Sequence, residues 1–171
     1  MKKRFSSLYL PILGVFLLFF PTTSNAYVLK SNKVTHPKDA YYWIESEFST
    51  YGLKSEIIRG LTAWNSLPEI QFTNEVTSVG GADVKMEYVN SLYGDVYAVH
   101  RTQGNITFYK NWRTDLSSTK RKETAVHEVG HALGLDHTQS KNNSISVMRK
   151  LGFNNKDYPL SDDIAGIKAK Y

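Results

Sequence analysis

The feature that most constrains this chain is the segment His127–His137, which holds three of its five histidines. It reads His-Glu-Val-Gly-His-Ala-Leu-Gly-Leu-Asp-His. On a helix, residues four apart such as His127 and His131 lie on one face, about one turn from each other. Two imidazole nitrogens placed in this way can reach one zinc ion at about 2.0–2.1 Å. The spacing therefore predicts a helix that carries two ligands of one metal ion.

A third histidine, His137, follows His131 by six positions. On a continued helix this spacing is a rotation of about 600°, which would put the ring on the wrong side. The chain must therefore leave the helix and turn back. Gly134 permits such a break, because glycine adopts a positive φ without a Cβ clash. We predict that Gly134 ends the helix and that His137 is the third ligand.

Glu128 directly follows the first histidine of the segment. A carboxylate at this position lies near the metal without having to bind it, which suits a general base that acts on zinc-bound water. A structural zinc site, the alternative, usually has four protein ligands and no open position. The composition here predicts one catalytic zinc ion with Glu128 as the base. Binding of a calcium ion in addition to zinc is left open, but no clear calcium motif supports it.

The N-terminus has the composition of a secretory signal peptide. Positive residues at Met1–Arg4 precede an apolar run, Leu8–Phe20, and small residues follow at Ser24 and Ala26. This order predicts cleavage after Ala26. A retained membrane anchor is the alternative, but the run is shorter than the about 20 apolar residues that span a bilayer. We expect a signal peptide over 1–26 and one secreted domain over 27–171, with no membrane attachment after cleavage.

Charge and cysteine content exclude several other functions. The formal net charge is +5, and the expected signal peptide carries three of the positive charges, so the remaining domain has +2. The domain has no dense stripe of Lys and Arg with interleaved aromatic residues, so we expect no nucleic-acid partner. The chain has no cysteine, which excludes disulfides, thiolate zinc ligands and thiol catalysis. We expect a monomer.

The pattern of apolar residues predicts an α+β domain. Alternating or β-prone segments predict strands over 40–44, 70–73, 82–88, 96–99 and 105–109. Apolar residues at helical spacing predict a helix over 53–66. A second helix is expected from the caps at 117–119 to Leu133, and a third from Ser161 as N-cap. The strands would form one mixed sheet.

The pattern H-E-x-x-H-x-x-G-x-x-H resembles the signature of the metzincin metallopeptidases, and the chain resembles a matrixin catalytic domain. The resemblance covers most of 27–171 and is strongest in three segments, His127–Thr138, Ser146–Met148 and Leu160–Ile167. It implies a zincin-like fold, with a twisted five-stranded mixed sheet and three helices that include the zinc-binding helix. It also implies that Met148 lies beneath the three histidines and that an extended substrate binds an edge strand near Tyr97–Arg101.

The chain also departs from the matrixin pattern. Matrixins carry a second, structural zinc held by three histidines and an aspartate, whereas this region has only His100 and Asp95. We therefore expect one zinc and leave His100 out of the site. Matrixins have a prodomain whose cysteine blocks the zinc, whereas this chain has no cysteine. Arg149-Lys150 stands where the family usually has Tyr-Pro, beside the pocket for the residue after the cleaved bond.

These observations predict a secreted zinc-dependent endopeptidase. It would hydrolyse peptide bonds of extended protein substrates through a zinc-bound water that Glu128 activates. One alternative is a zinc-stabilised binding or adhesion module without catalysis, which the presence of Glu128 disfavours. The other is a hydrolase of the same fold that acts on non-protein amides, which the sequence does not separate from a peptidase.

Overall fold

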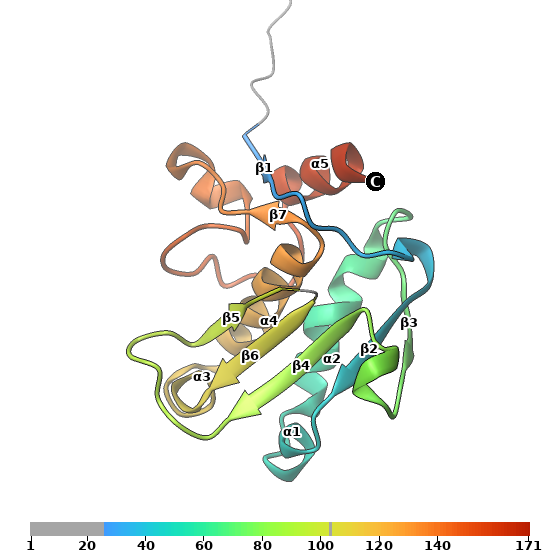
Figure 1. Ribbon diagram of the computed structural model, residues 1–171. Coiled ribbons are helices and arrows are strands. Elements are labelled where there is room, and N and C mark those ends of the chain that lie inside the picture. Colours follow the sequence, from blue (N-terminus) through green and yellow to red (C-terminus); the bar gives the residue numbers. More distant parts are fainter. Residues whose placement is uncertain (1–25, 103) are drawn as a thin grey trace, which may run out of the picture.

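The computed structural model describes residues 26–102 and 104–171, and Figure 1 shows their arrangement. The expected signal peptide falls on residues that lie outside this part of the chain, except for Ala26. Within the described residues, no helix combines the length and the apolar character needed to cross a bilayer.

Five strands form the mixed sheet that the sequence predicted (Figure 1). They are β2 (Ala40–Ile44), β3 (Phe72–Glu75), β4 (Val84–Val89), β5 (Ala98–His100) and β6 (Asn105–Tyr109). Their order is β3-β2-β4-β6-β5, and all neighbours are parallel except β5 and β6, which are antiparallel. The antiparallel strand β5 therefore lies at one edge of the sheet.

Strand β4 shows the alternation of buried and more exposed side chains that is typical of a strand with one face in the core. Val84, Met86 and Tyr88 are buried and alternate with half-buried residues, because successive side chains of a strand point to opposite faces. Three strand starts, those of β3, β4 and β5, were predicted two residues too early. A turn in which Ile70 N donates to Leu67 O precedes β3, and another in which Val96 N donates to Tyr93 O precedes β5.

Three longer helices were predicted and are present. They are α2 (Lys54–Thr62), which continues as the 3₁₀ turn η2 (Ala63–Ser66), α4 (Ser118–Ala132) and α5 (Ser161–Lys170). Helices α2 and α4 pack against each other behind the sheet (Figure 1). Gly60 of α2 allows this approach, because a Cβ there would collide with Ala125 of α4. The core lies between these helices and the sheet and includes Trp64, Phe108 and Trp112.

The prediction that Ser161 caps α5 was wrong. The N-cap is Leu160, and the Asp163 carboxylate accepts its N–H at 2.8 Å. A carboxylate at the third helical position can thus accept the backbone N–H of the N-cap residue, even when that residue has no polar side chain.

Several short elements were not predicted. They are α1 (Glu47–Thr50), α3 (Lys110–Asp115), the 3₁₀ turns η1 (Pro37–Asp39), η3 (Val79–Gly81) and η4 (Ser140–Ile145), and the strands β1 (Val28–Leu29) and β7 (Leu135–Asp136). Strands β1 and β7 pair antiparallel as a separate two-stranded sheet. This pairing places the N-terminal segment directly beside the residues that precede His137.

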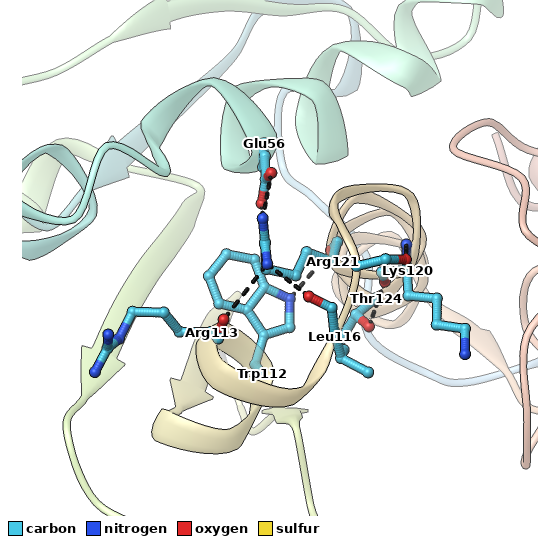
Figure 2. Close-up of polar contacts among 8 residues, drawn as sticks. Glu56, Trp112, Arg113, Leu116, Lys120, Arg121 and Thr124 are labelled. Atoms are coloured by element: carbon cyan, nitrogen blue, oxygen red, sulfur yellow. Dashed lines mark hydrogen bonds and ion pairs between the residues drawn. The ribbon is translucent and has the colours of Figure 1, made fainter.

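A buried ion pair joins α2 to the start of α4 (Figure 2). The Arg121 guanidinium makes two hydrogen bonds to Glu56, and its Nη1 donates to Leu116 O at 2.6 Å. The indole Nε1 of Trp112 donates to Arg121 O at 3.1 Å. These contacts fix the first turns of the helix that carries His127, Glu128 and His131.

Candidate metal centre

Helix α4 begins and ends as predicted. The Ser117 hydroxyl accepts the Lys120 N–H at its start. Gly134 follows its C-cap residue, Leu133, with φ of 92°, a left-handed conformation that favours glycine. Lys30 N donates to Gly134 O at 2.8 Å. The chain then turns into β7, which leads directly to His137.

The structure brings His127, His131 and His137 together. One ring nitrogen from each lies within 4.8 Å of the others. The Nε2 atoms of His131 and His137 are 3.3 Å apart. Two ligands of a tetrahedral zinc at about 2.0–2.1 Å are separated by about 3.3–3.4 Å, so this pair has the spacing that zinc requires.

The other ring nitrogens of the two helical histidines contact backbone carbonyls. His127 Nδ1 lies 2.7 Å from Val147 O, and His131 Nδ1 lies 2.8 Å from Leu135 O. A carbonyl oxygen only accepts, so both Nδ1 atoms carry the proton and donate. Each Nε2 then has a free lone pair, as a metal ligand needs.

The three imidazoles are held neutral. Burial lowers the pKa of His127, His131 and His137, and that of His131 falls to about 2. The neighbouring imidazoles further lower the pKa of His131 and of His137. Because a histidine must be neutral to bind a metal, the protonation state and the geometry both fit a zinc ion.

Glu128 lies beside this group on α4 and is buried, with 7% of its surface exposed. Its Oε2 accepts the backbone N–H of His100 in β5 at 2.6 Å. Burial raises the pKa of Glu128 from 4.5 to about 7, while the His100 N–H and the nearby Lys30 oppose the rise. A carboxyl group with this pKa can exchange a proton near neutral pH.

A cavity of about 300 Å³ opens beside His127 and Glu128. The segment Asp95–Ala98 before and in β5 forms one wall, and the segment Arg149–Phe153 forms another. The cavity therefore connects the edge strand to the base and can receive a side chain of a bound ligand.

Met148 lies against α4 between the ligand positions. It is buried, and its sulfur lies so close to Gly130 that a Cβ at that glycine would collide with it. The Trp64 ring also lies close to Gly130. Met148 thus packs beneath the helical turn that joins His127 to His131.

The segment before Met148 is anchored by a buried carboxylate that the sequence interpretation did not include. Asp163 accepts the Ser146 hydroxyl and the Val147 N–H, the latter at 2.9 Å. Val147 O in turn faces His127 Nδ1. Sequence periodicity carries no signal for this contact between Asp163 and a distant segment.

Comparison with known proteins identifies the family. The model of the matrixin family matches residues 33–171. The chain belongs to the matrixin family. Membership confirms the predicted family, the α+β metzincin fold and the catalytic zinc that matrixins use. The three-histidine group supplies residues that could hold this ion.

Individual relatives of this matrixin share little more than a quarter of their aligned residues with it. Stromelysin-2 of Rattus norvegicus is 28% identical over 134 residues, which cover 68% of this chain and 28% of that protein. Matrix metalloproteinase-27 of Homo sapiens is 27% identical over 133 residues, covering 67% of this chain and 25% of that protein. The matrixin described here therefore spans only about a quarter of the length of these relatives.

The two remaining histidines of this matrixin differ in position. His36 is exposed. His100 is half-buried in β5, and its ring centroid lies 6.4 Å from that of His131. Burial lowers the pKa of His100 to about 4. His100 was left out of the predicted site, yet its backbone N–H directly contacts the Glu128 carboxylate.

Proposed function

We propose that this matrixin is a secreted, monomeric zinc-dependent endopeptidase with Glu128 as its general base. The observation that carries the proposal is the position of the buried Glu128 carboxylate, which directly follows His127 on α4 beside the three-histidine group. In the metal-free protein, burial raises the pKa of this carboxyl group to about 7, and general acid–base groups act best when their pKa lies near the working pH.

His127, His131 and His137 would hold the zinc ion. When bound, zinc supplies a Lewis acid that polarises the scissile carbonyl and lowers the pKa of a water molecule. Glu128 takes the proton of the attacking water at its carboxylate. It then passes this proton to the amine nitrogen that leaves.

The protein around this centre favours an extended peptide. Strand β5 lies at the sheet edge beside Glu128, and a peptide can add to such an edge through main-chain hydrogen bonds. The cavity next to Glu128 offers space for a substrate side chain. Two features of the site thus support a peptide substrate over a small non-protein amide.

Secretion rests on the N-terminal sequence. The proposed signal peptide covers 1–26, and the catalytic domain covers 27–171. We expect the exported protein to begin at Tyr27, and N-terminal sequencing of material from the culture medium would establish this. An intact N-terminus in the membrane fraction would favour the retained anchor instead.

Digestion of casein by the zinc-loaded protein tests the activity. We expect cleavage that a zinc chelator abolishes, and a loss of about 10²–10⁴-fold in kcat in Glu128→Gln with zinc content retained. Glu47→Gln, a change of an exposed glutamate in α1, serves as the matched control. Wild-type turnover in Glu128→Gln would refute the assignment of the base. Zinc binding without any cleavage would favour a binding module, and cleavage of non-protein amides alone would favour the other hydrolase.

A further inference from the structure

We propose that the backbone N–H of His100 positions the general base, by holding the Glu128 carboxylate at the edge of β5. This inference rests on the proposed role of Glu128. It assigns a function to a main-chain group that no sequence motif reveals.

The hydrogen bonds of β5 show which way the His100 N–H points. Tyr109 N donates to Tyr97 O at 2.9 Å, and Arg101 N donates to Asn105 O at 2.8 Å. Tyr97 and Arg101 therefore face β6. Because facing and non-facing residues alternate along an antiparallel strand, the main-chain groups of Ala98 and His100 face away from the sheet.

The outward N–H of His100 meets Glu128 from α4 at 2.6 Å. An edge strand normally presents such a group unpaired, whereas here the buried carboxylate accepts it. Among the described residues, this is the hydrogen bond found for the Glu128 carboxylate, and it involves Oε2. Oε1 thus remains available to accept a proton.

The contact joins two rigid parts of the fold. Glu128 lies on α4 about one turn before its end at Ala132, and His100 lies on a strand that pairs with β6 from Ala98 to His100. A glutamate has several rotatable bonds, and a charge-assisted hydrogen bond to a fixed main-chain donor selects one orientation. Orientation matters because displacing a reacting group by about 1 Å can cost about 100-fold in rate.

The same contact limits where a substrate strand can pair. A peptide at the β5 edge cannot use the His100 N–H while Glu128 accepts it. The outward N–H and C=O of Ala98 remain, and Ala98 also lines the cavity beside the base. A substrate strand that pairs with Ala98 would therefore place a side chain in the cavity and its main chain beside Glu128 in a single alignment.

Hydrogen exchange tests the contact without relying on activity. In ¹⁵N-labelled protein, the His100 amide should exchange at least about tenfold faster in Glu128→Ala than in wild type, because its acceptor is lost. The Val99 amide, which faces β6, is the internal control and should keep its protection. An unchanged His100 exchange rate in Glu128→Ala would overturn the proposal. That result would not bear on the proposed peptidase activity, which the casein digestion tests separately.

A pair of substitutions tests the functional consequence. His100→Ala and His100→Pro both lack the imidazole, but only the proline variant also lacks the N–H. Proline is tolerated at edge-strand positions whose N–H faces away from the sheet. We expect kcat of His100→Pro to be about 10–100-fold below that of His100→Ala, at equal zinc content and with KM within about twofold.

Equal kcat in the two folded variants would refute the positioning role. Should His100→Pro fail to fold, an amide-to-ester replacement at the Val99–His100 bond removes the same N–H without fixing φ. Its kcat is then compared with that of the semisynthetic protein with the normal amide. The same ratio is expected, and an unchanged kcat would again reject the proposal.

Discussion

His127 Nδ1 lies 2.7 Å from Val147 O, and this contact ties the orientation of a predicted zinc ligand to the segment that leads to α5. Val147 N donates in turn to Asp163 Oδ2 at 2.9 Å. The ring of His127 is thus oriented through two hydrogen bonds that end at a buried carboxylate in the first turn of α5.

Asp163→Ala should weaken zinc binding although Asp163 is not one of the predicted ligands. Loss of partners that orient a ligand typically costs about 10–100-fold in metal affinity. We expect a decrease of this size in a competition titration with a zinc chelator. Asp115→Ala, at an exposed position at the end of α3, is the control and should bind zinc like the wild type. Equal affinities in both variants would contradict the proposed link.

Gly134→Ala should destabilise the fold more than a glycine substitution in open space. A Cβ at Gly134 would collide with the carbonyl oxygen of Asn32, whereas a Cβ at Gly52 would meet nothing within 4 Å. Both glycines have positive φ, 92° and 70°, so Gly52→Ala measures the backbone strain alone. We expect Gly134→Ala to cost about 1–3 kcal/mol more in unfolding free energy, as for overpacking. Urea unfolding of the metal-free proteins measures the difference, and equal costs would show that the turn tolerates the added atom.

Arg121→Ala should be among the most destabilising changes outside the metal centre. It leaves Glu56, whose side chain is 9% exposed, without its partner. Removing one member of a buried ion pair typically costs about 3–5 kcal/mol. Lys54→Ala breaks an exposed pair with Glu75 and should cost at most about 1 kcal/mol. Thermal and urea unfolding of both variants test the contrast, and similar losses would mean that the buried pair contributes no more than the surface one.

Glu128→Gln should stabilise the metal-free protein at high pH. Burial raises the pKa of Glu128 from 4.5 to about 7, so the folded protein binds this proton more tightly than the unfolded chain. Stability from this group is present at low pH and is lost as pH rises from about 4.5 to 7. The gain in unfolding free energy of Glu128→Gln over wild type should be larger at pH 8 than at pH 4.5, by up to about 3 kcal/mol. A gain that does not change with pH would contradict a raised pKa.

The elements predicted best are those with a strong local pattern. Helix α4 was predicted from the caps over 117–119 and its end at Gly134; its N-cap is Ser117, and Gly134 follows its C-cap residue. The alternation in β4 gave its buried face. Each of these features depends on residues a few positions apart, so the sequence alone contains the information.

The failed prediction of the α5 cap concerns a carboxylate with both local and distant partners. Ser161 has the side chain of an N-cap, but Asp163 satisfies the Leu160 N–H instead. Asp163 is also engaged by Ser146 and Val147. A local rule for helix caps cannot account for a carboxylate that serves two segments at once.

The sequence by itself indicated the family through the resemblance of its motif, and it predicted His127, His131 and His137 as metal ligands and a helix end at Gly134. The ligand and helix-end predictions follow from helical spacing and from the backbone freedom of glycine, which are local properties. Only the tertiary structure decided what surrounds that pattern. The edge of β5 is brought to Glu128 by sheet pairing, and the carbonyl of Val147 is brought to His127 by packing of the segment before α5. Both contacts involve main-chain groups, which every residue carries, so no residue type in the sequence predicts them.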